Sequence, residues 1–264
     1  MTSISSPHHQ KLLDAVRETV AGDERFIGLL AGGSLLHGGF DEFSDLDLVL
    51  VVSEAAYDEV LAGRRVIAGS IGPLLAAFTG EHVGEPRLLI CLYGDPPVHV
   101  DLKFVTADAL DRLIERPAII WARTDAIEQR IAGAEIQWPD RPLEWFEERF
   151  WIWVHYATTK LGRGELFEAL GIMGFIREQV LGPLIHHRLG RPQRGVRRLE
   201  AQSPEWTERL RATVGTHDEA DVIRALNETV ALYRELRNAD QSAGHKAESV
   251  VTAYLESVIA TRQA

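Results

Sequence analysis

Two short motifs carry the residue types in this chain that are best suited to chemistry. One is the Gly-Gly-Ser turn at residues 32–34, and the other is the pair Asp45 and Asp47, which opens the apolar run 48–52. Residues two apart on a strand point to the same face, so we expect the two carboxylates to lie together. Hard oxygen ligands suit Mg²⁺, and a glycine-rich turn that opens a helix suits a phosphate. The two motifs together predict a site for a nucleoside triphosphate on Mg²⁺.

A third acid lies further along the chain. Asp101 stands between apolar neighbours in the run 98–105, which reads as a strand. A carboxylate there can complete a two-metal site or remove the proton of an attacking hydroxyl. Gly33 and Ser34 can offer backbone N–H groups and a hydroxyl to the β- and γ-phosphates, because glycine allows close backbone approach.

Two histidines lie near these motifs. His37 falls between the turn and the Asp pair, and contact with nucleotide or substrate and an ordinary loop position both stay open. His99 is interpreted as structural, on the expectation that it points away from Asp101.

The order of these elements resembles the DNA polymerase beta-type nucleotidyltransferase superfamily. Its signature is an apolar strand, a Gly-Gly/Ser turn, a spacer, Asp-x-Asp in an apolar strand, and a later acid between apolar residues. Residues 29–34, 45–48 and 100–102 match in that order, within residues 25–105. With a helical second half, the chain resembles the bacterial small-molecule members, among them aminoglycoside and lincosamide nucleotidyltransferases, which adenylylate a drug hydroxyl.

The resemblance implies a role for each matching residue. The catalytic and metal-binding carboxylates would be Asp45, Asp47 and Asp101. The nucleotide would be bound by Gly33, Ser34 and, from the first long helix of the second domain, Lys160. Some members place the base on the helical domain instead, which leaves three alternatives to Asp101: Glu147, Glu148 and Glu165.

The implied function is a Mg²⁺-dependent nucleotidyltransferase. It would move a nucleoside monophosphate to a hydroxyl of a small molecule such as an antibiotic. The co-substrate would be ATP or another NTP, and AMP is the first candidate for the transferred group. Two alternatives stay open. One is a toxin-like nucleotidyltransferase that acts on tRNA or a protein, and the other is a non-catalytic nucleotide-binding module.

The charge distribution bears on the acceptor. The net charge is −11, and residues 1–135 hold 21 Asp and Glu against 11 Lys and Arg. This acidity favours a cationic small molecule and disfavours nucleic acid, whose nonspecific binding relies on neutralised phosphates. The arginines among residues 188–198 form a basic cluster. A solvated helix end is the favoured interpretation, and a contact to pyrophosphate or RNA is the alternative.

Hydrophobic periodicity predicts an α/β (α+β) fold with two domains. Residues 1–135 form a small mixed sheet with flanking helices, and residues 136–264 form a helical bundle. Strands are expected at 25–31, 45–52, 87–93 and 98–105. Helices of the first domain are expected around 12–20, after Ser53, over 67–78 and over 106–114. Those of the second are expected at 144–161, 164–189, 204–214, 219–237 and 246–259.

Composition suggests the compartment. Cys91 is the single cysteine, and no apolar run approaches the roughly 20 residues that span a bilayer. Residues 1–10 are polar and lack the apolar core of a signal peptide. We therefore expect a cytoplasmic protein with no membrane partner, as a monomer or a homodimer.

Overall fold

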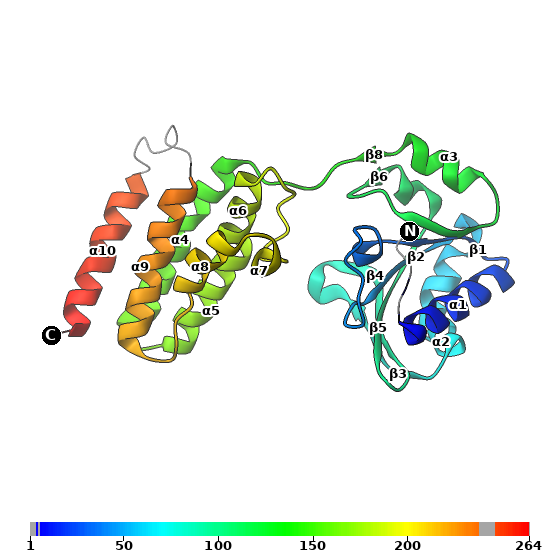
Figure 1. Cartoon of the computed structure of the whole chain (residues 1–264), viewed down its shortest axis with the longest axis horizontal. Helices are drawn as coiled ribbons and strands as arrows, with labels where there is room; N and C mark the ends of the chain where they lie inside the picture. The colour runs from blue at the N-terminus through cyan, green and yellow to red at the C-terminus, as the bar shows by residue number, and fades with distance from the viewer. Residues whose placement is uncertain (1–3, 5, 238–245, 264) are drawn as a thin grey trace. The chain divides into compact units, whose positions relative to one another are not determined.

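The chain divides into two compact units. The computed structural model describes residue 4, residues 6–237 and residues 246–263, so part of the N-terminal segment considered above lies outside the described residues. The units are Met1–Trp138, which holds a sheet, and Pro139–Ala264, which is helical (Figure 1). The predicted fold class, a mixed-sheet domain followed by a helical domain, is confirmed. Within the described parts of the chain, no helix has both the length and the apolarity to cross a membrane.

The first unit is built on a six-stranded sheet with the order β3-β4-β5-β2-β1-β7. Its strands are β1 (Phe26–Ala31), β2 (Leu46–Val52), β3 (Leu74–Gly80), β4 (Glu85–Tyr93), β5 (Val98–Val105) and β7 (Ala118–Ala122). Only β2 and β5 run parallel among these neighbours, and the other pairs are antiparallel. The short strands β6 (Arg112–Leu113) and β8 (Glu135–Ile136) pair separately.

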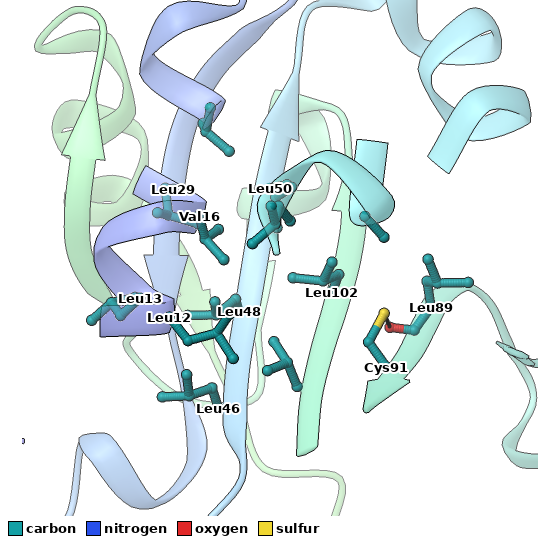
Figure 2. Packing of buried hydrophobic residues seen from close by; sticks show 14 of the residues in the cluster. Leu12, Leu13, Val16, Leu29, Leu46, Leu48, Leu50, Leu89, Cys91 and Leu102 are labelled. Atoms are coloured by element: carbon teal, nitrogen blue, oxygen red, sulfur yellow. Dashed lines mark hydrogen bonds between the residues drawn. The ribbon is translucent and has the colours of Figure 1, made fainter. Parts of the chain in front are cut away.

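Helices of the first unit cover the sheet. They are α1 (Pro7–Gly22), α2 (Tyr57–Ile71) and α3 (Ala126–Gly133), with 3₁₀ segments η1 (Gly33–Leu35), η2 (Glu54–Ala56), η3 (Glu81–Val83) and η4 (Ala107–Leu110). Leucines of α1 pack with Leu46, Leu48 and Leu50 of β2 in the main core (Figure 2). Successive strand residues point to opposite faces. The odd-numbered residues of β2 therefore face away from this core.

Two predicted helices of the first unit are wrong. The segment 67–78 is helical only as far as Ile71, and Leu74–Gly80 is strand β3, paired with β4. Proline disfavours helix at the residue before it, so Gly72-Pro73 ends α2 and lets the chain enter the sheet. The segment 106–114 holds only η4 and then β6. Strand β7 and helix α3 were not expected.

The second unit contains the five predicted helical segments. They correspond to α4 (Leu143–Gly162), α5 (Leu166–Ile176) continued by the π segment η5 (Arg177–Leu181) and α6 (Gly182–Arg188), α8 (Pro204–Ala212), α9 (Glu219–Leu236) and α10 (Lys246–Gln263). A short helix, α7 (Leu199–Gln202), is additional. The expected irregularity near Gly182-Pro183 is present as η5. Aromatic residues of α4 and α9 form the centre of this unit, and Phe150 stacks on Tyr233.

Candidate active site

Asp47 and Asp101 lie opposite each other on adjacent strands. The parallel strands β2 and β5 pair these two residues in register. Paired residues point to the same side of a sheet, and Leu46 and Leu48 already occupy the side of the main core. Both carboxylates therefore project from the other face. The Asp101 side chain is 24% exposed, so solvent can reach it.

Asp45 completes the acidic group from the chain just before β2. Burial is the largest influence on the pKa of Asp101 and raises it. A hydrogen bond from His99 lowers this pKa, and the charge of Asp45 raises it further, so the net shift is upward. Asp45 thus acts on Asp101 through its charge and not through a hydrogen bond. The structure thus pairs Asp47 with Asp101 in register and leaves Asp45 just before β2.

The loop before Asp45 is fixed by hydrogen bonds. The Ser44 hydroxyl donates to Oδ1 of Asp41 (2.9 Å), and the Asp41 and Phe43 backbone N–H groups close the turn. Nε2 of His9, a buried residue of α1, donates to the Ser44 carbonyl (2.8 Å), and the Ser6 hydroxyl donates to its Nδ1 (2.7 Å). The residue preceding Asp45 is therefore tied to α1. His9 was not singled out from the sequence.

The glycine turn touches the acidic group directly. Gly33 has φ +59°, a left-handed conformation that favours glycine. A Cβ added to it would lie 1.8 Å from Oδ2 of Asp47. The backbone N–H of Gly32 donates to the Asp47 carbonyl (2.9 Å). Glycine at position 33 therefore leaves room for the Asp47 carboxylate.

Ser34 carries a buried hydroxyl. The residue is 5% exposed, and its Oγ has no hydrogen-bond partner among the described residues. Such a group costs free energy when nothing satisfies it. A ligand with acceptor oxygens at this turn would supply the missing partner.

Glu115 joins the turn from a distant part of the chain. The backbone N–H of Gly33 donates to its Oε1 (3.1 Å), and Nε2 of His37 donates to its Oε2 (2.9 Å). Glu115 lies in the loop between β6 and β7, 82 residues after Gly33. Sequence reasoning missed it because no local motif marks it. The same contact places His37 at the turn.

The expectation for His99 was wrong. Its Nε2 donates to Oδ1 of Asp101 (2.9 Å). Residues two apart on a strand share a face, so His99 lies on the same side of β5 as Asp101. The imidazole therefore orients the Asp101 carboxylate.

The acidic residues carry carboxylate oxygens, which are the kind of donor that Mg²⁺ prefers. In the described part of the chain, no three His, Cys, Asp or Glu side chains are grouped as a ready metal site. Mg²⁺ is commonly held by one or two carboxylates, with substrate phosphates and water completing the octahedron. Asp45 and Asp47 offer two carboxylates of this kind, and Gly33 packs on Asp47.

The remaining predicted residues lie in the helical unit. Nζ of Lys160 on α4 contacts Oε2 of Glu165 (2.8 Å) and Oε2 of Glu168 (3.6 Å). Lys160 and Glu165, two of the sequence candidates, are therefore each other's partners. The hydrogen bond to Glu165 is the main cause that raises the pKa of Lys160.

The other alternative bases have structural partners. Glu147 accepts from Nε1 of Trp151 (3.0 Å) and from the Tyr233 hydroxyl, and it contacts Arg237 (3.4 Å). Its side chain is 12% exposed. Glu148 is exposed and pairs with Arg149. These contacts give Glu147 a role in the core of the helical unit.

Two arginines of the basic cluster also have structural contacts. Arg188 donates to the Glu235 carbonyl (3.0 Å), and Arg191 donates to Oε1 of Gln202 (3.2 Å) and to the Ser203 hydroxyl (3.3 Å). They connect neighbouring segments of the helical unit.

Comparisons with known proteins gave matches only among solved structures. No family model matches the sequence, and no curated protein matches it. The chain is similar to an aminoglycoside 6-adenyltransferase from Bacillus subtilis, with a TM-score of 0.42 and 16% identity over 95% of this chain and 98% of that one. It is also similar to a nucleotidyltransferase-like protein from Exiguobacterium sibiricum, with a TM-score of 0.38 and 11% identity over 86% of this chain and 75% of that one. Because these values are low, we base the function on the residues of this chain.

Proposed function

We propose that the chain is a Mg²⁺-dependent nucleotidyltransferase that moves a nucleoside monophosphate to a hydroxyl of a small molecule, with ATP as the first candidate donor. The observation that carries the proposal is the register pairing of Asp47 with Asp101, with Gly33 packed on Asp47. An acidic pair next to a glycine turn provides for both the metal and the triphosphate.

Asp101 is the proposed general base. The raised pKa of its carboxyl, which burial causes, makes it a better proton acceptor than an ordinary aspartate. It would take the proton of the acceptor hydroxyl, whose oxygen then bonds to the α-phosphorus. The bond from that phosphorus to the bridging oxygen breaks, and pyrophosphate leaves with the electron pair. His99 holds the Asp101 carboxylate in place.

Asp45 and Asp47 would hold Mg²⁺ against the phosphate oxygens. Bound there, the metal supplies charge neutralisation for the triphosphate and the departing pyrophosphate. Gly33 would give close backbone approach to the phosphates, and the buried Ser34 hydroxyl would donate to one of their oxygens. Lys160 of the helical unit is proposed as a further contact to the triphosphate.

A cationic small molecule is the proposed acceptor class. The acidic balance of residues 1–135 attracts such molecules, and an aminoglycoside is a first candidate. A tRNA or protein acceptor would draw on the basic cluster at residues 188–198, but Arg188 and Arg191 are already engaged within the helical unit. We therefore rank the macromolecular acceptor second.

A transfer assay on the purified full-length chain tests the proposal. Labelled ATP, GTP, CTP and UTP are incubated with Mg²⁺ and with aminoglycosides, lincosamides or bulk tRNA. We expect label on a small molecule, and at least about a hundredfold less with Asp101→Asn. Label on tRNA would mean that the acceptor is a macromolecule and not a small molecule. A lack of transfer with every combination of NTP and acceptor would contradict the proposal.

A further inference from the structure

The glycine turn already holds an anion that belongs to the chain itself. Oε1 of Glu115 accepts from the Gly33 backbone N–H, and Oε2 accepts from Nε2 of His37. A carboxylate only accepts hydrogen bonds, so Nε2 of His37 must carry a hydrogen. Two donors therefore converge on the two oxygens of one carboxylate.

These donors suit a phosphate as well as a carboxylate. Backbone N–H groups and imidazole N–H groups bind both kinds of oxyanion. Oε1 of Glu115 also lies beside Gly32, because a Cβ added there would be 3.8 Å from it, an ordinary contact distance. The neighbouring Ser34 Oγ is buried and has no partner among the described residues, even with Glu115 at the turn. The carboxylate thus leaves part of the hydrogen-bonding capacity of the turn unused.

Glu115 reaches the turn from a surface loop. It follows Ile114, which is 55% exposed, and its own side chain is 18% exposed. Its neighbour Arg116 donates to the Ile131 carbonyl (3.0 Å), which anchors the loop on α3. All of these residues belong to the first unit. The Arg116 contact would hold the loop backbone in place if the Glu115 side chain turned away from Gly33.

We propose that Glu115 occupies a phosphate position in the Gly33 turn, that an incoming triphosphate displaces it, and that His37 then binds the phosphate. The proposal rests on the proposed function for the identity of the ligand. A carboxylate and a phosphate oxygen cannot accept from the same two donors at once, and their like charges repel at this distance. Glu115 therefore lowers the affinity for the triphosphate, and its removal raises it.

Calorimetric titration with Mg²⁺-tripolyphosphate tests this independently of any transfer reaction. The full-length variants are Glu115→Ala, Glu115→Gln and the double variant Glu115→Ala/His37→Ala. Glu128→Ala is the matched control, because it removes one exposed negative charge on α3 of the same unit. Ionic strength is held constant, and the melting temperature of each variant verifies folding.

We expect Glu115→Ala to bind tripolyphosphate about tenfold more tightly than the wild type, with Glu128→Ala unchanged. Glu115→Gln keeps an acceptor for the Gly33 N–H but loses the charge. Its gain in tripolyphosphate affinity should therefore be smaller than that of Glu115→Ala. If Glu115→Ala fails to fold, the tripolyphosphate affinity of Glu115→Gln tests the proposal in its place. The double variant should lose the gain, because His37 is then absent.

Unchanged or weaker binding by Glu115→Ala, or no binding by any variant, would overturn the proposal. Weaker binding would instead make Glu115 a ligand of the metal. Tighter binding by Glu115→Ala without transfer to any acceptor would sustain the displacement and refute the proposed function, so the two can fail separately.

Discussion

Replacing Gly33 by alanine should separate the geometry of the site from the stability of the fold. The added Cβ would lie 1.8 Å from Oδ2 and 2.8 Å from Cγ of Asp47, distances that no packed structure tolerates. The Asp47 carboxylate must therefore leave its position, or the turn must move. Either change separates the proposed metal ligand from the proposed phosphate-binding turn.

The cost to stability should be moderate. A left-handed conformation costs an L-residue about 1–2 kcal/mol, and Gly33 has φ +59°. At about 2–4 °C per kcal/mol for a domain of this size, the melting temperature should fall by about 2–8 °C. The affinity for Mg²⁺-NTP should fall much more, by about a hundredfold, because even indirect disturbance of a metal ligand costs about 10–100-fold.

Gly84→Ala is the matched control for this variant. Gly84 also has a positive φ, +74°, but a Cβ there would meet nothing within 4 Å. It lies in the turn between β3 and β4. Gly84→Ala should therefore show only the thermal loss from its left-handed backbone, with nucleotide binding unchanged, as measured by calorimetry. Equal nucleotide affinities for the two alanine variants would refute the placement of Asp47 beside the turn.

Three further variants test the base and the proposed cation. Asp101→Asn should lower kcat by about a hundredfold or more. It should also raise the melting temperature at neutral pH. Burial raises the pKa of Asp101, so its ionised form destabilises the folded chain, and asparagine removes that charge. The rise in melting temperature over the wild type should be full above the folded-state pKa of Asp101. It should vanish as the pH falls through that pKa towards 3.8, the ordinary value for an aspartate. A rise that does not depend on pH, measured by thermal shift, would contradict burial of Asp101 as its cause. Lys160→Ala should lower kcat/KM for the NTP by about 10–100-fold, and Lys160→Arg should recover part of it. Unchanged kinetics in steady-state assays would leave Lys160 only its contacts with Glu165 and Glu168 within the helical unit.

The sequence predicted the elements with strong local signals. The apolar runs of β2 and β5 and the Gly-Gly-Ser turn were recognisable, and the acids on them proved to be neighbours. Their register could not be read from the sequence, because strand pairing depends on contacts across the whole sheet. The strand at Leu74–Gly80 was missed because its pairing with β4 overrode a helix-like local pattern.

The parts of the site that the sequence did not reveal are long-range contacts. Glu115 reaches Gly33 across 82 residues, and His9 reaches Ser44 across 35. Neither residue lies in a motif, so only the folded chain brings them to the site. His99 was misjudged for a simpler reason, since its spacing from Asp101 already placed both on one face.

The most direct test of the central claim is the metal dependence of nucleotide binding. The melting temperature of the wild type and of Asp47→Asn is measured with NTP alone, with Mg²⁺ alone and with both, and far-UV circular dichroism verifies the fold. Binding to the native state raises the melting temperature. The wild type should gain stability from NTP only when Mg²⁺ is present, and Asp47→Asn should not gain it. A full gain without Mg²⁺, or an undiminished gain in Asp47→Asn, would contradict a metal-bound triphosphate at this site.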